Sequence, residues 1–92
     1  MATYSVTRSK NATLSTTTVD TITLGQQWPA VEITNGDATN ALYVRVDGTA
    51  ATAAGDNCTM ILPASSKVIG LGGSVTVSII GNGNVYSCEG VN

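Results

Sequence analysis

Few side chains in this sequence could carry acid–base or nucleophilic chemistry. The chain has 92 residues and no histidine, so neither a Ser–His nor a Cys–His nucleophile pair can form. A glycosidase would need two carboxylates that face each other across a cleft, and a domain of this size rarely has such a cleft. The acids are Asp20, Glu32, Asp37, Asp47, Asp56 and Glu89. We therefore expect that the protein is not an enzyme.

The aspartates of the predicted loops are candidates for metal binding. Asp37, Asp47 and Asp56 stand near asparagine and glycine, and their oxygens could bind calcium. Their spacing does not match an EF-hand loop. Asp and Asn next to Gly more often form turns, in which they accept hydrogen bonds from their own backbone. We favour turns, and we expect neither a metal nor a cofactor.

Cys58 and Cys88 are the only cysteines, and their spacing is not that of a zinc site or a CxxC redox motif. Two interpretations remain. The one we favour is two reduced thiols packed as small hydrophobic side chains. The other is a single disulfide that clamps the last strand to a central one. Alternation places Cys58 on the face of Met60 and Leu62, predicted to point inward, which suits either interpretation.

Composition indicates a small domain with a polar, nearly uncharged surface. Apolar residues make up 42% of the chain, enough for a packed core. Charged residues make up only 11%, against about a quarter in typical domains, and Thr, Ser, Asn and Gly take their place. A length of 92 residues leaves room for one hydrophobic core. We expect a single β-sandwich domain over residues 1–92, which could begin with an N-terminal arm at 1–10.

The charges argue against two classes of partner. The net charge is −2, and the basic residues Arg8, Lys10, Arg45 and Lys67 give no dense positive patch for phosphates or for a membrane surface. No apolar run approaches the roughly 18 residues that span a bilayer. The N-terminus also lacks the apolar region of a signal peptide. We expect no nucleic acid and no membrane among the partners, and a soluble protein that folds where it is made.

The pattern of apolar residues predicts an all-β chain, because β-branched residues dominate and helical spacing is absent. Short runs are separated by turn-forming Gly, Asn, Asp and Pro at near-regular intervals. This is typical of a small β-sandwich, jelly-roll or immunoglobulin-like, or of a partly open barrel of about eight short antiparallel strands. The predicted strands cover residues 3–8, 12–24, 28–34, 42–47, 58–62, 67–71, 74–80 and 84–89.

Alternation along these strands assigns their two faces. The inward face should hold Val31, Ile33, Leu42, Val44, Val46, Met60, Leu62, Val75, Val77 and Ile79. The outward face should hold Glu32, Tyr43, Arg45, Asp47, Thr76 and Ser78. Between strands, GNGN at residues 81–84 is the tightest hairpin candidate. One side of each sheet should therefore face water or a partner.

Trp28 is the only tryptophan, in a chain that has no phenylalanine. It precedes Pro29, which cannot donate to a ladder, so it should stand at an edge or at the start of a strand. With Tyr43 and Arg45 it could form a platform for a carbohydrate or an anchor for a protein. We favour the interpretation that Trp28 fills the end of the sandwich as the largest core side chain.

The stretch 35–66 combines LYVRVDGT, a loop of small residues, GDN, a short apolar strand and the turn LPASS. In this order it resembles the small β-sandwich proteins of tailed bacteriophages that bind the outside of the assembled capsid as decoration, or cement, proteins. Relatives of this kind also occur as tail and fibre accessory domains. The residues that carry the resemblance are Asn40, Leu42, Tyr43, Val44, Val46, Asp47, Gly48, Asp56 and Pro63.

The resemblance implies a structural virion protein, made in the host bacterial cytoplasm and located on the outer capsid surface. Its partner would be the major capsid protein, whose subunits it would bridge to stabilise the shell, and it would form a homo-trimer. The alternative is a carbohydrate- or receptor-binding module of a tail fibre or other tail accessory protein, with Trp28 or Tyr43 as the stacking platform.

Partner contacts are expected at Tyr4, Arg8, Tyr43, Arg45, Asp47 and Asp56. The loop 47–57 belongs with them, because its small residues would allow a close backbone approach to another subunit, or would merely let the chain cross the end of the sandwich. Arg45 could bond to an acidic capsid surface, or it could pair with Glu32 on a neighbouring strand.

Overall fold

A computed structural model describes residues 2–92, which form nine β-strands and no helix. The all-β class predicted from the sequence is confirmed. One more strand is present than predicted, because the segment 12–24 is divided between two strands. The strands are β1 (Ala2–Val6), β2 (Ser9–Thr13), β3 (Asp20–Leu24), β4 (Ala30–Asn35), β5 (Leu42–Arg45), β6 (Thr59–Ile61), β7 (Ser65–Gly70), β8 (Thr76–Ile80) and β9 (Val85–Val91).

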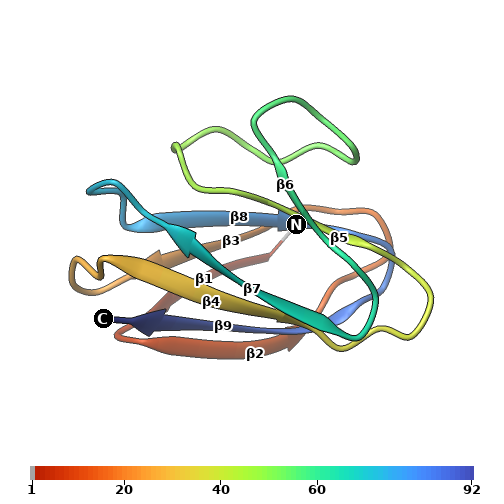
Figure 1. Cartoon of the computed structure of the whole chain (residues 1–92), viewed down its shortest axis with the longest axis horizontal. Helices are drawn as coiled ribbons and strands as arrows, with labels where there is room; N and C mark the ends of the chain where they lie inside the picture. Colours follow the sequence, from red (N-terminus) through yellow and green to blue (C-terminus); the bar gives the residue numbers. More distant parts are fainter. Residues whose placement is uncertain (1) are drawn as a thin grey trace.

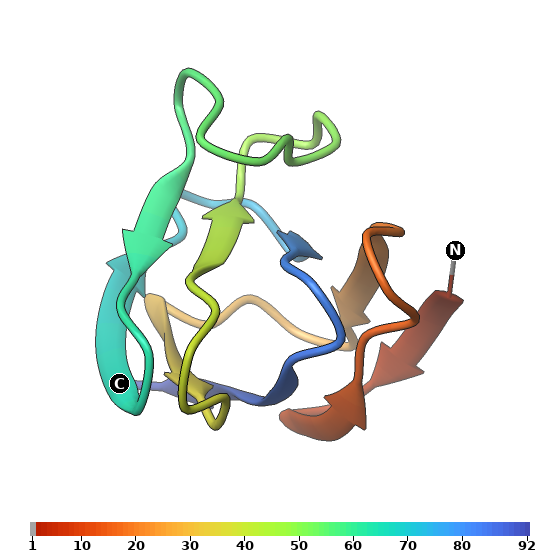
Figure 2. The same cartoon turned by 90° about the vertical axis from the view of Figure 1, so that its right-hand side faces the viewer.

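The strands form two sheets that pack face to face in a small β-sandwich (Figure 1). Sheet A has the order β1-β3-β8-β5-β6, and sheet B has the order β2-β9-β4-β7. Within residues 2–92 every pairing is antiparallel except that of β1 with β3, which is parallel. Seen end-on, the edge strands β6 and β7 lie on one side of the sandwich, and β1 and β2 lie on the other (Figure 2).

The N-terminal segment links the two sheets instead of extending as an arm. β1 pairs with β3 in sheet A, and β2 pairs with β9 in sheet B. Of the arm predicted at 1–10, Met1 lies outside the described residues, and the rest belongs to the sandwich. Residues 14–19 then carry the chain back to sheet A through a turn in which Thr16 has a φ of 50°. This crossing is what divides the predicted strand at 12–24.

The core lies between the sheets, and alternation predicted most of its strand residues correctly. Val31, Ile33, Leu42, Val44, Val77 and Ile79 are buried as expected, while Val46 and Val75 are only half-buried. The other buried apolar residues of this cluster are Leu14, Ile22, Leu24, Ile61, Leu71, Tyr86 and Cys88.

The prediction for β6 is wrong by one residue. Met60 and Leu62 are 45% and 58% exposed, whereas Ile61 between them is fully buried. The pairing with β5 explains the register, because Ile61 lies opposite the buried Leu42 and Met60 lies opposite Tyr43 on the outer face. The exposed pair therefore belongs to the surface at the open edge of sheet A.

Polar groups inside the sandwich connect the two sheets. Tyr86 of β9 donates a hydrogen bond of 2.8 Å to the carboxylate of Asp20 on β3, and both residues are buried. At one end, the buried Asn84 amide donates to Asn35 Oδ1 at 3.0 Å and to the Asn40 carbonyl at 2.8 Å. Every buried side-chain nitrogen and oxygen of residues 2–92 has a partner, as a low-dielectric core requires.

The segment GNGN is a crossing between sheets and not a hairpin, so this prediction is wrong. β8 lies in sheet A and β9 in sheet B, and the two strands do not pair. Asn84 Oδ1 accepts a bond from the backbone of Asn82 at 2.6 Å, which closes the turn from within the core. The buried Asn84 side chain therefore holds this turn in place, as the backbone ladder would in a hairpin.

Both cysteines are free, in agreement with the favoured interpretation of two thiols. Cys88 is buried on β9, and its burial raises the pKa of the thiol to about 12. Cys58 is half-buried just before β6.

Within residues 2–92 there is no helix long and apolar enough to cross a membrane.

Candidate functional site

Asp20 and Asp37 have structural roles within the sandwich and a turn. Asp20 is buried against Tyr86. Asp37 accepts bonds from the backbone of Thr39 and Asn40, which lower the pKa of its carboxyl group. It therefore forms a turn, as predicted for the loop aspartates. Residues 2–92 contain no group of three or more Asp, Glu or Cys side chains that could hold a metal ion.

Arg45, Asp47 and Asp56 come together at the base of the loop 47–57. Arg45 Nε donates to Asp47 Oδ1 at 2.7 Å, and this bond lowers the pKa of the Asp47 carboxyl and raises that of the guanidinium. Arg45 Nη1 also reaches the Asp56 carbonyl at 3.5 Å. The suggested pairing with Glu32 is wrong, because β4 and β5 lie in different sheets. The Arg45 side chain is only 19% exposed, and its guanidinium already donates hydrogen bonds to Asp47 and Asp56 of the loop that follows.

The loop 47–57 folds over the outer face of sheet A. The buried Ala51 donates its backbone N–H to Ser78 Oγ at 2.8 Å, and the loop stands above β8 in Figure 1. Ser78 was predicted to face outward, and it does, but the loop covers it so that it is only 4% exposed. Part of the outer face of sheet A is therefore closed by the chain itself.

The aromatic and basic residues near the N-terminus pair with each other. The Arg8 guanidinium lies over the Trp28 ring, 5.1 Å from its centroid, and the Lys10 ammonium lies 4.2 Å from the centroid of Tyr4. Trp28 Nε1 donates to the Thr7 carbonyl at 3.1 Å, and the ring packs against the core and over Gly90. Trp28 thus fills the end of the sandwich, as favoured from the sequence.

Tyr43 lies apart from the Tyr4–Arg8 group, on the outer face of sheet A. It is half-buried between Ile80 of β8 and Met60 of β6 in the strand register. The predicted contact residues therefore form no single surface. Tyr4 and Arg8 lie at the β1–β2 side, whereas Tyr43, Arg45, Asp47 and Asp56 lie on and above sheet A.

The outer face of sheet B is the open surface that the sequence analysis did not single out. None of its outward residues is buried. In the strand register one row runs Ser9, Glu89, Glu32, Val68, and the next runs Asn11, Ser87, Thr34, Ser66; Thr13 and Val85 follow. We call these ten residues the B face. The alternation of apolar and polar residues around Glu32 predicted that this side chain points outward. It could not predict which strands lie beside β4, because that depends on the sheet order.

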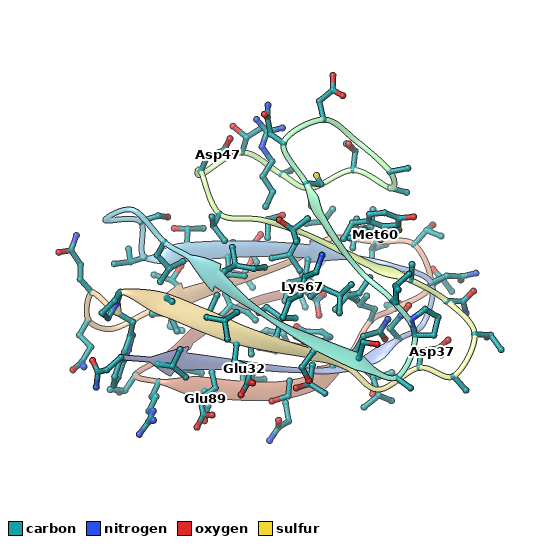
Figure 3. The ribbon with its side chains drawn as sticks, in the orientation of Figure 1. Glu32, Asp37, Asp47, Met60, Lys67 and Glu89 are labelled. Carbon is teal, nitrogen blue, oxygen red and sulfur yellow. The ribbon has the colours of Figure 1, made fainter. Side chains whose placement is uncertain are left out.

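A hollow of about 230 Å³ lies on the B face. Its lining comes from β2, β4, β9 and the residue after β4, and consists of Asn11, Thr34, Gly36, Val85, Tyr86 and Ser87. Glu32 and Glu89 are directly opposite each other in the next row, and both side chains project from the same side of the sheet (Figure 3). The surface thus combines a shallow apolar depression, neutral polar groups and two carboxylates.

Comparison with models of known protein families finds none that matches this chain, and comparison with curated proteins finds no match either.

Proposed function

We propose that the protein is a structural virion protein, a phage head decoration protein that binds the outer capsid surface and bridges major capsid subunits. The resemblance of residues 35–66 supplies the partner in this proposal. The observation that carries it is the B face, a four-stranded surface of hydroxyl, amide and valine side chains with two glutamates, which nothing in residues 2–92 covers. Its eight neutral side chains dock at a lower desolvation cost than buried ions.

The local pairing of charges fits a protein that adheres and does not catalyse. Arg45 is held by Asp47, Arg8 lies over Trp28, and Asp20 is enclosed with Tyr86. These contacts fix the ends and loops of the sandwich, and Glu32 and Glu89 are the only charged residues among the ten of the B face. A face on which eight of ten residues are neutral is suited to a repeated contact with a lattice.

Stabilisation of the shell would come from binding linkage. A protein that binds only the mature shell stabilises each site by about 4 kcal/mol when its free concentration is a thousandfold above Kd. Because every capsid offers many equivalent sites, a modest interface suffices. Formation of a trimer would add avidity by placing several faces on one shell.

A carbohydrate-binding module is the second candidate, and the hollow on the B face favours it. Its lining includes the polar residues Asn11, Thr34 and Ser87, and its volume is about 230 Å³. The two aromatic platforms suggested from the sequence favour it less. Trp28 packs over Gly90 and under Arg8, and Tyr43 is half-buried among strand neighbours.

The test is co-sedimentation of the purified protein with undecorated capsids of the phage that carries its gene. We expect saturable binding and a rise in the melting temperature of the shell. Expanded and unexpanded shells should be compared, because a decoration protein prefers one of them. Failure to bind either form, together with binding to a glycan array, would favour the second candidate.

A further inference from the structure

We propose that the B face is the docking surface, and that its partner is a protein surface with a lysine or arginine flanked by apolar side chains. This inference rests on the proposed function, in which that surface belongs to the capsid exterior. It changes the expected sign of the contact, because the sequence suggested Arg45 as a cation that would bind an acidic capsid.

The B face is more accessible than the outer face of sheet A. Sheet A has its outer face partly closed by the loop 47–57 through the Ala51–Ser78 bond. The B face has no such cover, and Val68 and Val85 on it are 62% and 55% exposed. The other large exposed hydrophobic side chains of residues 2–92 are Met60 and Leu62. Exposed aliphatic side chains on a flat sheet lose water favourably when a partner covers them.

The B face carries two neighbouring negative charges. Glu32 and Glu89 are direct cross-strand partners, and like charges in this position destabilise a sheet. Arg8 forms a long, exposed ion pair with Glu89, in which its Nε lies 3.8 Å from the carboxylate, and the same nitrogen donates to the Gly90 carbonyl at 3.0 Å. Within residues 2–92 Glu32 has no ion pair. A cation from a partner would neutralise both carboxylates, and this complementarity selects a basic partner over an acidic one.

The exposed valines and the hollow lie next to the two glutamates on the B face. Val68 stands in the same row as the two glutamates, and the hollow beside Val85 begins one row away. A lysine or arginine could lay its aliphatic stem against a valine and place its charged end between the carboxylates. An adjacent apolar side chain of the partner would then fill the hollow. The B face therefore has an apolar anchor site next to its charge site, as protein interfaces do.

The experiment compares capsid binding of Glu32→Gln, Glu89→Gln and the double variant with that of the wild type. Asp56→Asn removes one exposed charge from the loop 47–57, the rival docking surface expected from the sequence, and so separates the two surfaces. We expect the double variant to bind at least about tenfold more weakly, and Glu32→Lys to bind more weakly still. Asp56→Asn should bind within about twofold of the wild type. Binding of the wild type should fall with added salt more steeply than that of the double variant.

Weaker binding by the double variant would not be due to unfolding, because removal of a like-charge pair should leave its melting temperature equal to or higher than that of the wild type. A wild type that binds capsids while the double variant binds equally well would overturn this inference and leave the proposed function intact. Weaker binding of Asp56→Asn alone would assign docking to the loop. A wild type that binds no capsid would end both proposals. Binding of a neutral oligosaccharide that is lost on filling the hollow with Ser87→Tyr would show that the B face takes sugars and not a basic protein.

Discussion

The phenol of Tyr86 donates a hydrogen bond of 2.8 Å to the carboxylate of Asp20, and the bond joins sheet B to sheet A inside the core. Both residues are at most 2% exposed. The carboxylate is therefore away from water, and it depends on this hydroxyl for its side-chain contact across the core. This bond is one of the buried polar contacts between the two sheets.

Tyr86→Phe should lower the free energy of unfolding by roughly 1.5–3 kcal/mol, because it leaves a buried carboxylate without its donor. Urea denaturation monitored by circular dichroism measures the change. Tyr43→Phe is the matched control, since that phenol lies half-exposed on the outer face of sheet A. A loss of equal size in the two variants would mean that the Asp20 bond contributes nothing particular.

Stability should decline at alkaline pH, and Cys88 gives the reason. Its burial raises the pKa of the thiol to about 12, whereas the unfolded thiol titrates near 9. Below pH 9 both states hold the proton, so the contribution is complete. Between pH 9 and 12 the unfolded chain loses a proton that the native state keeps, so the free energy of unfolding falls by roughly 1 kcal/mol per pH unit.

Tyr86 should add to this decline, because burial and then the Asp20 bond raise the pKa of its phenol above the ordinary value near 10. Denaturation at pH 8, 9, 10 and 11 measures the slope. Cys88→Ala should flatten the slope between pH 9 and 10, whereas Cys58→Ser should leave it nearly unchanged. Equal slopes for wild type and Cys88→Ala would refute the assignment.

Gly90→Ala should destabilise the protein by about 1–3 kcal/mol through overpacking. A Cβ atom at this position would lie 2.5 Å from Cγ of Trp28. Gly70→Ala is the matched control on the same sheet, because a Cβ there would meet nothing within 4 Å. Thermal unfolding distinguishes the two, and tryptophan fluorescence should change only in Gly90→Ala.

Ser78→Ala should loosen the loop 47–57, because it leaves the buried N–H of Ala51 without an acceptor. We expect a loss of about 1–3 kcal/mol in the free energy of unfolding. Amide hydrogen exchange should show faster exchange at Ala51, while Thr76→Ala on the same strand face should leave it unchanged. Unaltered protection at Ala51 would mean that other contacts hold the loop.

Alternation predicted the residues of long, paired strands and failed on the shortest one. Ile33, Val44 and Val77 lie on strands in which most apolar positions point inward, although Ile80 of β8 lies opposite Tyr43 on the outer face. In β6 both alternating sets are apolar, so the sequence favoured Met60 and Leu62 by number over Ile61. The pairing with Leu42 decides the face, and that pairing is a long-range contact no local pattern contains.

The polar core and the candidate surface were beyond sequence reasoning for the same reason. Asn84 is typical of a turn, and its amide finds its partners only when Asn35 and Asn40, more than 40 residues away in the sequence, are brought next to it. Glu32 and Glu89 are far apart in the sequence and become neighbours through the sheet order. Faces follow from local alternation, whereas neighbours follow from topology.

The position of β9 also constrains how the molecule can be made. This last strand lies between β2 and β4 and supplies the whole ladder of β2. Sheet B therefore cannot be completed during synthesis until residue 91 has emerged from the ribosome, and β2 cannot form its ladder before that point, whereas β4 and β7 can pair earlier. Removal of β9 should accordingly leave β2 without its partner strand and open sheet B between β2 and β4.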